Sequence, residues 1–109
     1  MSTYPYSATA QKATATLVKS GRWKLKGYHM INLDTTNNFV QFFDAAAASA
    51  VTVGTTTPTF VLGLPASGGA VKVSDLVFTN GIVIAAATTA TGNGAPTNGV
   101  CLMLELGDS

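Results

Sequence analysis

Apolar and polar residues alternate with a period of two over several short stretches of this chain. In RWKLK, residues 22–26, the apolar Trp23 and Leu25 alternate with three basic residues. Because successive side chains of a β-strand point to opposite faces, this stretch is expected to form a strand with one basic, solvated face. Gly27 interrupts the alternation, and a β-bulge there would shift the parity of the residues that follow. The inward face would then continue through Tyr28, Met30 and Asn32.

Turn-forming residues divide the rest of the chain into further short apolar runs, which are expected to be strands. One run is bracketed by Pro58 and Pro65, and two more flank the dipeptide Asn80-Gly81. Asn-Gly between β-branched runs is the strongest short-range signal for a hairpin, so those two strands are expected to pair directly. The segment 88–99 has no period and is expected to be a long loop. Two more strands are expected over residues 13–18 and 100–106.

The stretch FVQFFDAAAASAV, residues 39–51, is compatible with either a helix or a strand. Phe39, Phe42 and Phe43 have the spacing of one helix face, and the alanines that follow favour a helix. The large apolar side chains, however, end after about seven residues, which makes a helix marginal. A strand over residues 39–44 is therefore expected, with the alanine run as a loop or a short turn.

A strand at this position would be apolar on both faces and would need cover on both. The domain core is expected to cover one face, and a neighbouring subunit is expected to cover the other. Val40 and Phe42 are therefore the candidate residues for self-association.

About seven or eight short strands with turns between them predict an all-β chain, with the pattern of an antiparallel β-sandwich or jelly roll. The 109 residues suffice for one domain. The sandwich is expected over residues 13–109, preceded by an extended N-terminal arm, residues 1–12. Tyr4 and Tyr6 are expected to anchor this arm on a neighbouring molecule, because tyrosine offers a large contact area with few rotatable bonds. The alternative is a frayed terminus.

The composition is 47% hydrophobic and only 10% charged, against about 25% charged residues in ordinary soluble domains. Such a surface suits a protein that packs against partners. The net charge of +1 provides no general attraction to nucleic acid. Five of the six basic residues lie in the first quarter of the chain. They could protect a strand edge from aggregation or contact an acidic partner.

The sequence offers no constellation of catalytic or metal-ligating residues. The single histidine, His29, and the single cysteine, Cys101, both lie in apparent core strands, and the acidic residues are scattered. No platform for single-stranded nucleic acid is expected, because the alternation turns Trp23 away from its basic neighbours. No apolar run reaches the roughly 18 residues of a membrane span, and no signal peptide is recognisable at the N-terminus. The prediction is a protein that is not an enzyme and binds no cofactor.

Several short motifs, taken in order, resemble a small β-sandwich domain of tailed-phage virion proteins. The matching positions are Trp23, Leu25, Gly27, Tyr28 and Asn32, then residues 39–45, then Pro58 and Pro65, then residues 78–85. The resemblance covers roughly residues 21–106 and departs from the usual pattern in the alanine run 45–48 and in the loop 88–99. It implies a jelly-roll-like sandwich without catalytic residues.

The resemblance also implies a role as a virion structural protein. The leading interpretation is a capsid decoration (cement) protein, a homotrimer that bridges and stabilises major capsid protein subunits on the capsid exterior after synthesis in the host cytoplasm. The alternative is a neck, tail or fibre component, with host receptor or glycan binding. No nucleic acid, membrane or small-molecule substrate is expected as a partner. The candidate capsid-contact residues are Tyr4, Tyr6, Lys19, Arg22, Lys24 and Lys26.

Overall fold

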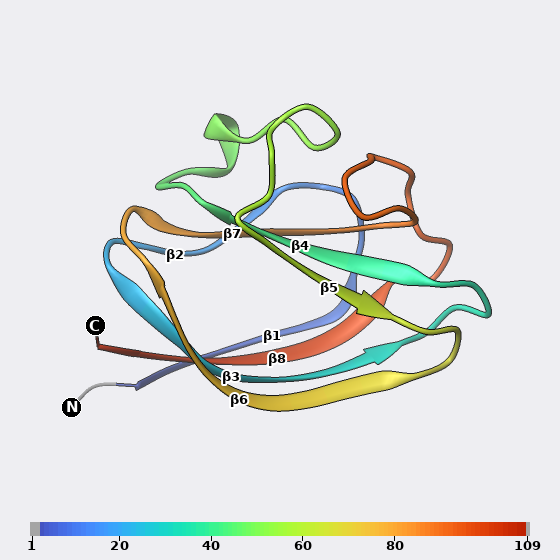
Figure 1. Ribbon diagram of the computed structural model, residues 1–109, viewed down its shortest axis with the longest axis horizontal. Coiled ribbons are helices and arrows are strands. Elements are labelled where there is room, and N and C mark those ends of the chain that lie inside the picture. The colour runs from blue at the N-terminus through green and yellow to red at the C-terminus, as the bar shows by residue number, and fades with distance from the viewer. Residues whose placement is uncertain (1–2, 109) are drawn as a thin grey trace.

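The computed structural model describes residues 3–108, and the side chains of all of these except residues 3, 73 and 74. In this range eight antiparallel strands form two four-stranded sheets that pack face to face (Figure 1). The strands are β1 (Thr3–Gln11), β2 (Thr16–Ser20), β3 (Trp23–Asn32), β4 (Asn38–Asp44), β5 (Phe60–Leu64), β6 (Gly69–Phe78), β7 (Gly81–Ala87) and β8 (Val100–Asp108).

The strand order is β1-β8-β3-β6 in one sheet and β2-β7-β4-β5 in the other. Only β4 and β5 are neighbours both in sequence and in a sheet, and every other connection crosses between the sheets. Eight strands wound in this way between two sheets have jelly-roll topology. The predicted all-β, jelly-roll-like antiparallel sandwich is therefore confirmed.

The bulge predicted at Gly27 is present in β3. The pairing of β3 with both neighbouring strands shifts register between Leu25 and Gly27. The extra residue changes the parity, so Leu25, Tyr28 and Met30 all point into the core although they do not follow one period-two series. The same shift turns His29 and Ile31 outward, and both are exposed.

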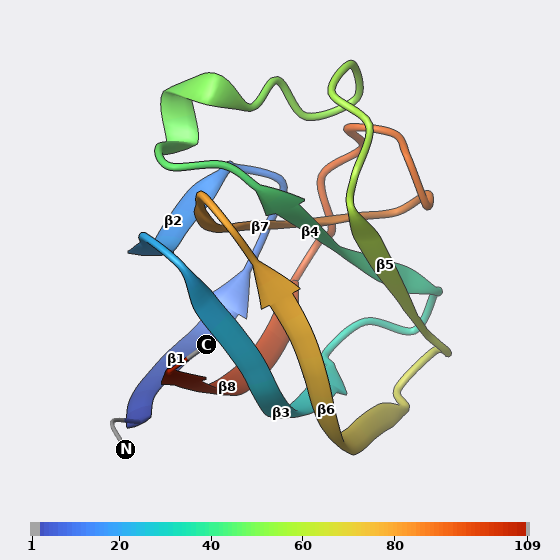
Figure 2. The same cartoon turned by 60° about the vertical axis from the view of Figure 1, so that its left-hand side comes forward.

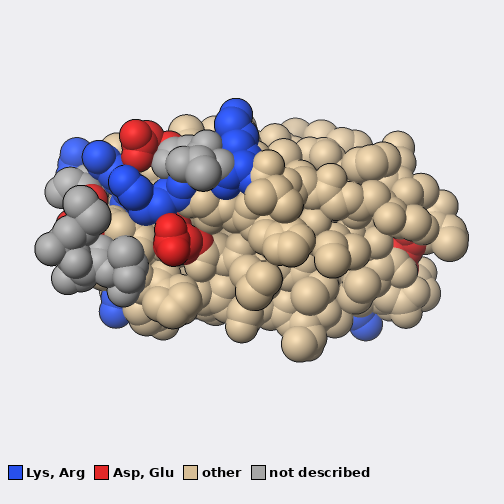
Figure 3. Space-filling model, turned by 90° about the horizontal axis from the view of Figure 1, so that it is seen from below, with Lys and Arg blue, Asp and Glu red and all other residues tan. Residues whose placement is uncertain are grey.

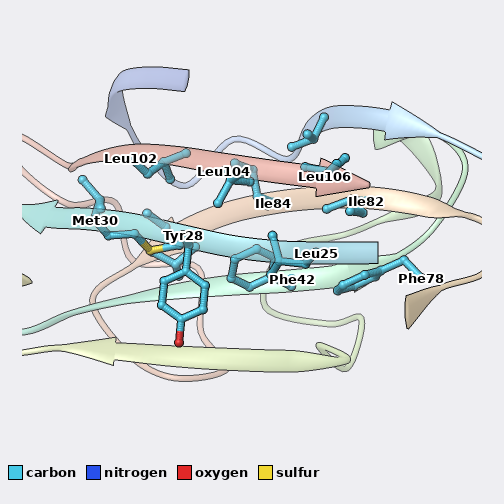
Figure 4. Packing of buried hydrophobic residues seen from close by; sticks show 14 of the residues in the cluster. Leu25, Tyr28, Met30, Phe42, Phe78, Ile82, Ile84, Leu102, Leu104 and Leu106 are labelled. Carbon is cyan, nitrogen blue, oxygen red and sulfur yellow. The ribbon is translucent and has the colours of Figure 1, made fainter. Parts of the chain in front are cut away.

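The main apolar core fills the space between the two sheets. Leu102, Leu104 and Leu106 of β8 lie in this cluster with Ile82 and Ile84 of β7 (Figure 4). Each strand that contributes to the core alternates inward and outward side chains, as sheet-on-sheet packing requires. The other buried members of the cluster are Val18, Leu25, Tyr28, Met30, Val40, Phe42, Leu64, Phe78, Ala86 and Val100.

Residues 38–44 form strand β4, which confirms the strand interpretation of the ambiguous stretch. Phe42 packs in the main core against Phe60 and Phe78, with ring centroids 5.5 Å and 6.3 Å apart. The alanine run that follows is irregular except for a three-residue 3-10 helix, Ala48–Ala50. The short turn expected there is therefore confirmed. The expected strand over residues 13–18 begins later than predicted, at Thr16.

The N-terminal segment corrects the prediction of an arm outside the sandwich. Residues 3–11 form β1, the outer strand of a sheet, which pairs with β8 from Thr3 opposite Gly107 to Gln11 opposite Val100. An isolated proline is tolerated in an edge strand, so Pro5 does not prevent this pairing. The extended conformation was predicted correctly, but the boundary between an arm and a domain at residues 12 and 13 does not exist in this fold.

The hairpin predicted at Asn80-Gly81 is also wrong. The strands on either side, β6 and β7, belong to different sheets, so the dipeptide lies in a corner between the sheets. The carboxylate of Asp44 holds this corner by accepting hydrogen bonds from the backbone N–H groups of Thr79 at 3.0 Å and Asn80 at 2.7 Å. A local turn signal cannot reveal that a distant aspartate stabilises a sheet-crossing corner instead.

A buried polar network closes the opposite end of the sandwich. Asp34, which is only 5% exposed, accepts hydrogen bonds from the Asn38 side chain at 2.8 Å and from the backbone N–H groups of Asn98 and Gly99 at 2.8 Å and 3.2 Å. Asn32 accepts a further bond from Asn38 at 2.7 Å. A buried carboxylate is stable only when hydrogen-bonded in this way, so the network ties the long 88–99 loop to the start of β4.

The lowered pKa values of Asp34 and Asp44 predict that the fold loses stability in acid. The Asn38 hydrogen bond, with those from Asn98 and Gly99, lowers the pKa of Asp34. Burial acts to raise the pKa of Asp44, but the N–H donors Asn80, Thr79 and Gly81 and the nearby Arg22 outweigh it and lower that pKa. A folded-state pKa below the unfolded value stabilises the fold above about pH 4, and this contribution is lost as the pH falls through the folded-state values.

Denaturant unfolding measured from pH 7 to pH 2 tests this expectation. The free energy of unfolding should fall with decreasing pH below about pH 4, because the unfolded chain then binds more protons. The double variant Asp34→Asn, Asp44→Asn should be less stable at neutral pH and should show a shallower decline. An equally steep decline in this variant would mean that other groups cause the acid sensitivity.

Candidate interaction surface

The predicted basic contact residues gather at one end of the molecule. Figure 3 views the outer face of the β1-β8-β3-β6 sheet, where Lys and Arg side chains lie close to acidic side chains at one end. Of the four predicted basic residues, Lys19 and Lys26 make interactions within the chain. Lys26 forms an ion pair with Asp75 on β6, with 3.4 Å between Nζ and Oδ1. Arg22 lies exposed in the turn between β2 and β3, and Lys24 is half-buried on β3.

Lys19 takes part in a cluster with two aromatic rings. Its ammonium group lies 4.8 Å from the centre of the Tyr4 ring and 5.6 Å from that of Trp23, within the range of a cation–π interaction. The two rings lie 6.1 Å apart, and the Trp23 indole N–H donates a hydrogen bond to the carbonyl of Ser20 at 3.1 Å. The prediction concerned only the flanking Arg22 and Lys24; it did not foresee that Lys19 reaches Trp23 from another strand.

Tyr4 and Tyr6 are not placed to anchor an arm on a neighbour. Both are half-buried on the inward side of β1 and pack against the main core. Burial raises the pKa of Tyr6, with the neighbouring Tyr4 as a smaller cause. Part of their aromatic surface is therefore used inside this fold, and a capsid contact by either residue stays a prediction.

Val40 and Phe42 are also corrected, since both side chains are fully buried in the core. The opposite face of β4 is covered by the chain itself rather than by another subunit. Phe43 packs in a second apolar cluster with Val51 from the segment after β4. The amide group of Gln41 donates to carbonyl groups of the 88–99 loop, at 3.1 Å to Ala90 and 3.0 Å to Gly92. The strand did need cover on both faces, but loops provide it.

An apolar patch that the sequence-based prediction missed lies on the outer face of the β1-β8-β3-β6 sheet. We call Ile31, Val71 and Met103 the outer patch; their exposed fractions are 45%, 74% and 52%. His29 is directly opposite Val71 on one side and Met103 on the other, so the patch spans β6, β3 and β8. The parity shift at Gly27 was the signal that could have located it, because that shift turns His29 and Ile31 outward.

Figure 3 shows that, away from its charged end, the outer face of this sheet carries few charged side chains. Next to the patch lies a shallow depression of about 310 Å³, lined by residues that include Pro5, Gly27, His29, Met103 and Glu105. An apolar area bordered by polar and charged side chains is the usual composition of a protein interaction site.

The described part of the chain contains little that could perform chemistry. Within residues 3–108, no group of three or more His, Cys, Asp or Glu side chains is placed to hold a metal ion. His29 is exposed and Cys101 is half-buried, and both lie on the outer face rather than in the core as expected. Among the described residues, no helix has the length and apolarity needed to cross a lipid bilayer.

Comparison with known proteins adds one distant similarity. The sequence matches no protein-family model, and a search of curated proteins gave no match. Among solved structures, the coat protein dimer of Tobacco streak virus aligns with 97% of this chain and 85% of that chain, at 9% sequence identity and a TM-score of 0.43. An alignment at this level establishes neither a common family nor a common function.

Proposed function

We propose that this protein is a non-catalytic structural component of a virion, most specifically a capsid decoration protein of a tailed phage. The outer patch is the observation that carries the proposal. It remains exposed although the sandwich is otherwise complete, and an exposed patch that crosses three strands indicates a surface for another protein. The order of motifs that resembles tailed-phage virion domains supports a capsid subunit as that protein.

In this proposal the outer face, rather than an N-terminal arm, contacts the capsid exterior. The outer patch would pack on apolar surface, and Arg22 and Lys24 at the charged end would approach acidic groups of the major capsid protein. A copy that touches two adjacent capsid subunits buries surface on both of them. Separating those subunits then requires that this surface be exposed again, which slows rupture of the shell.

The number of copies in purified particles tests the proposal and separates it from the alternative. A decoration protein should be present in hundreds of copies, and a neck, tail or fibre component in a handful or in dozens. Quantitative mass spectrometry of particles, with the major capsid protein as internal standard, measures this ratio. Absence of the protein from particles would rule out both virion functions.

Charged substitutions in the outer patch should weaken attachment to particles. Introducing Ile31→Asp and Val71→Asp together places two carboxylates where apolar contact is proposed, and we expect bound copies to fall at least about tenfold. The protein should keep its circular dichroism spectrum, since both side chains are already exposed. Cosedimentation of purified protein with undecorated capsids is the measurement.

The matched control is Leu17→Asp, which changes a residue of similar type and 38% exposure on β2 of the other sheet. It should leave attachment unchanged. Equal attachment by the outer-patch variant and by the wild type would show that this face is not the contact surface.

A further inference from the structure

The four edge strands of the sandwich differ in how well they are protected against pairing with another chain. An edge strand exposes unpaired backbone N–H and C=O groups, and natural proteins usually block it with charges, proline or bulges. β1 contains Pro5 and an irregularity between Ala8 and Gln11. β2 carries Lys19 and a register shift beside it.

The remaining two edges lie on the same side of the molecule. β6 carries Lys72 and Asp75, and its pairing with β3 contains a register shift. β5, with the sequence FVLGL, carries no charge and no proline, and its pairing with β4 is regular over all five residues. It lies at the margin of its sheet with no strand beyond it (Figure 2). Among the four edges of the described fold, β5 alone has none of these protections.

We propose that β5 pairs antiparallel with β5 of a second copy of this chain, about a twofold axis through Leu62. Pairing centred there places Phe60 opposite the partner's Leu64, Val61 opposite the partner's Gly63, and Leu62 opposite itself. Opposed residues of an antiparallel pair point to the same face. Phe60, Leu62 and Leu64 all face the main core of their own copy, so the two cores become continuous across the axis.

The outer face of β5 fits this register as well. Gly63 lies opposite Phe39 of β4, whose ring is so close that a β-carbon on Gly63 would lie 3.2 Å from it. A larger residue there would require the Phe39 ring to shift, and Phe39 itself is half-exposed. In the proposed pair, the partner's Val61 lies beside Gly63 and covers the exposed part of the Phe39 ring. Phe39 thereby gains apolar cover that its own chain does not supply.

The neighbouring edge strand is compatible with this contact. A cleft of about 280 Å³ separates the β5 and β6 edges, lined by Tyr28, Phe60, Lys72, Asp75 and Leu76. When β5 pairs with its counterpart, the β6 edges of the two copies also approach. Each carries one basic and one acidic side chain, so opposite charges can face each other across the axis. A second copy is therefore favoured over a peptide of arbitrary charge.

Sedimentation velocity of the purified protein over a range of concentrations tests this pairing. We expect a monomer–dimer equilibrium, and Val61→Lys should raise the dissociation constant at least about tenfold, because two lysines then lie diagonally across the axis. Leu17→Lys, which adds the same charge to the β2 edge, should leave the equilibrium unchanged. Mixing the Val61→Lys and Val61→Glu proteins should restore the dimer, since the diagonal charges are then opposite.

Hydrogen exchange on the wild-type protein provides a test that needs no variant. The backbone amides of residues 60–64 that point outward should become protected as the protein concentration rises. A wild type that stays monomeric up to about 0.5 mM, or that forms trimers, would overturn the inference. A dimer that persists unchanged in Val61→Lys would do so too. The outcome is independent of the proposed virion function, which depends on the outer patch instead.

Discussion

Removal of residues 1–11 should abolish the cooperative fold of this protein. These residues include β1, which pairs with β8 and places Tyr4, Tyr6 and Ala8 against the main core. Burying an aromatic side chain of this size contributes up to about 2 kcal/mol, and the lost pairing exposes the backbone of β8 as well. Together, the lost aromatic burial and the lost strand pairing are comparable with the free energy of unfolding of a domain of this length, roughly 5–15 kcal/mol.

Circular dichroism and a thermal melt of the truncated protein measure the effect. We expect a loss of the sharp unfolding transition, together with aggregation through the newly exposed β8. Adding a synthetic peptide of residues 1–11 should restore the transition, because the missing strand can pair from outside. A truncated protein with an unchanged melting temperature would support the arm that the sequence suggested, rather than a structural strand.

Much of the architecture was predictable because each strand carries its own inward and outward alternation. The alternation in β3 is an example. One glycine that interrupts its period-two pattern, Gly27, correctly indicated a bulge and the inward position of Tyr28 and Met30. What a local pattern cannot contain is the partner of a strand. The pairing of β1 with β8 joins residues separated by almost the whole chain, and no local signal distinguishes that strand from an arm.

The same limit explains the errors at the candidate surface. Lys19 meets Trp23 and Tyr4 only because β2, β3 and β1 come together at one end of the molecule. Periodicity on β3 alone placed Trp23 correctly relative to its sequence neighbours but had no information about β2. The cover over β4 was missed for a related reason: loops that are irregular in sequence provide it, through Gln41 and Phe43.

Replacing Phe42 with alanine should lower the free energy of unfolding by about 3–5 kcal/mol, the range observed for large aromatic residues removed from a packed core. The Phe42 side chain is fully buried between the rings of Phe60 and Phe78, which β5 and β6 hold in place. The backbone of Phe60 is held by pairing with β4, and Phe78 is itself buried, which limits how far the site can collapse. The cavity would therefore remain largely open, and the cost should lie toward the upper part of the range.

Denaturant titration of Phe42→Ala, with Met103→Ala as the matched control, separates a core residue from a surface contact. Met103→Ala also removes a large apolar side chain. Because Met103 is 52% exposed on the outer face, this replacement should change the free energy of unfolding by less than about 1 kcal/mol. If Phe42 were a subunit contact, its loss would change the oligomeric state and leave the unfolding energy of the monomer nearly intact. The buried position predicts the reverse: a large loss of stability, measured at a concentration low enough to keep the protein monomeric.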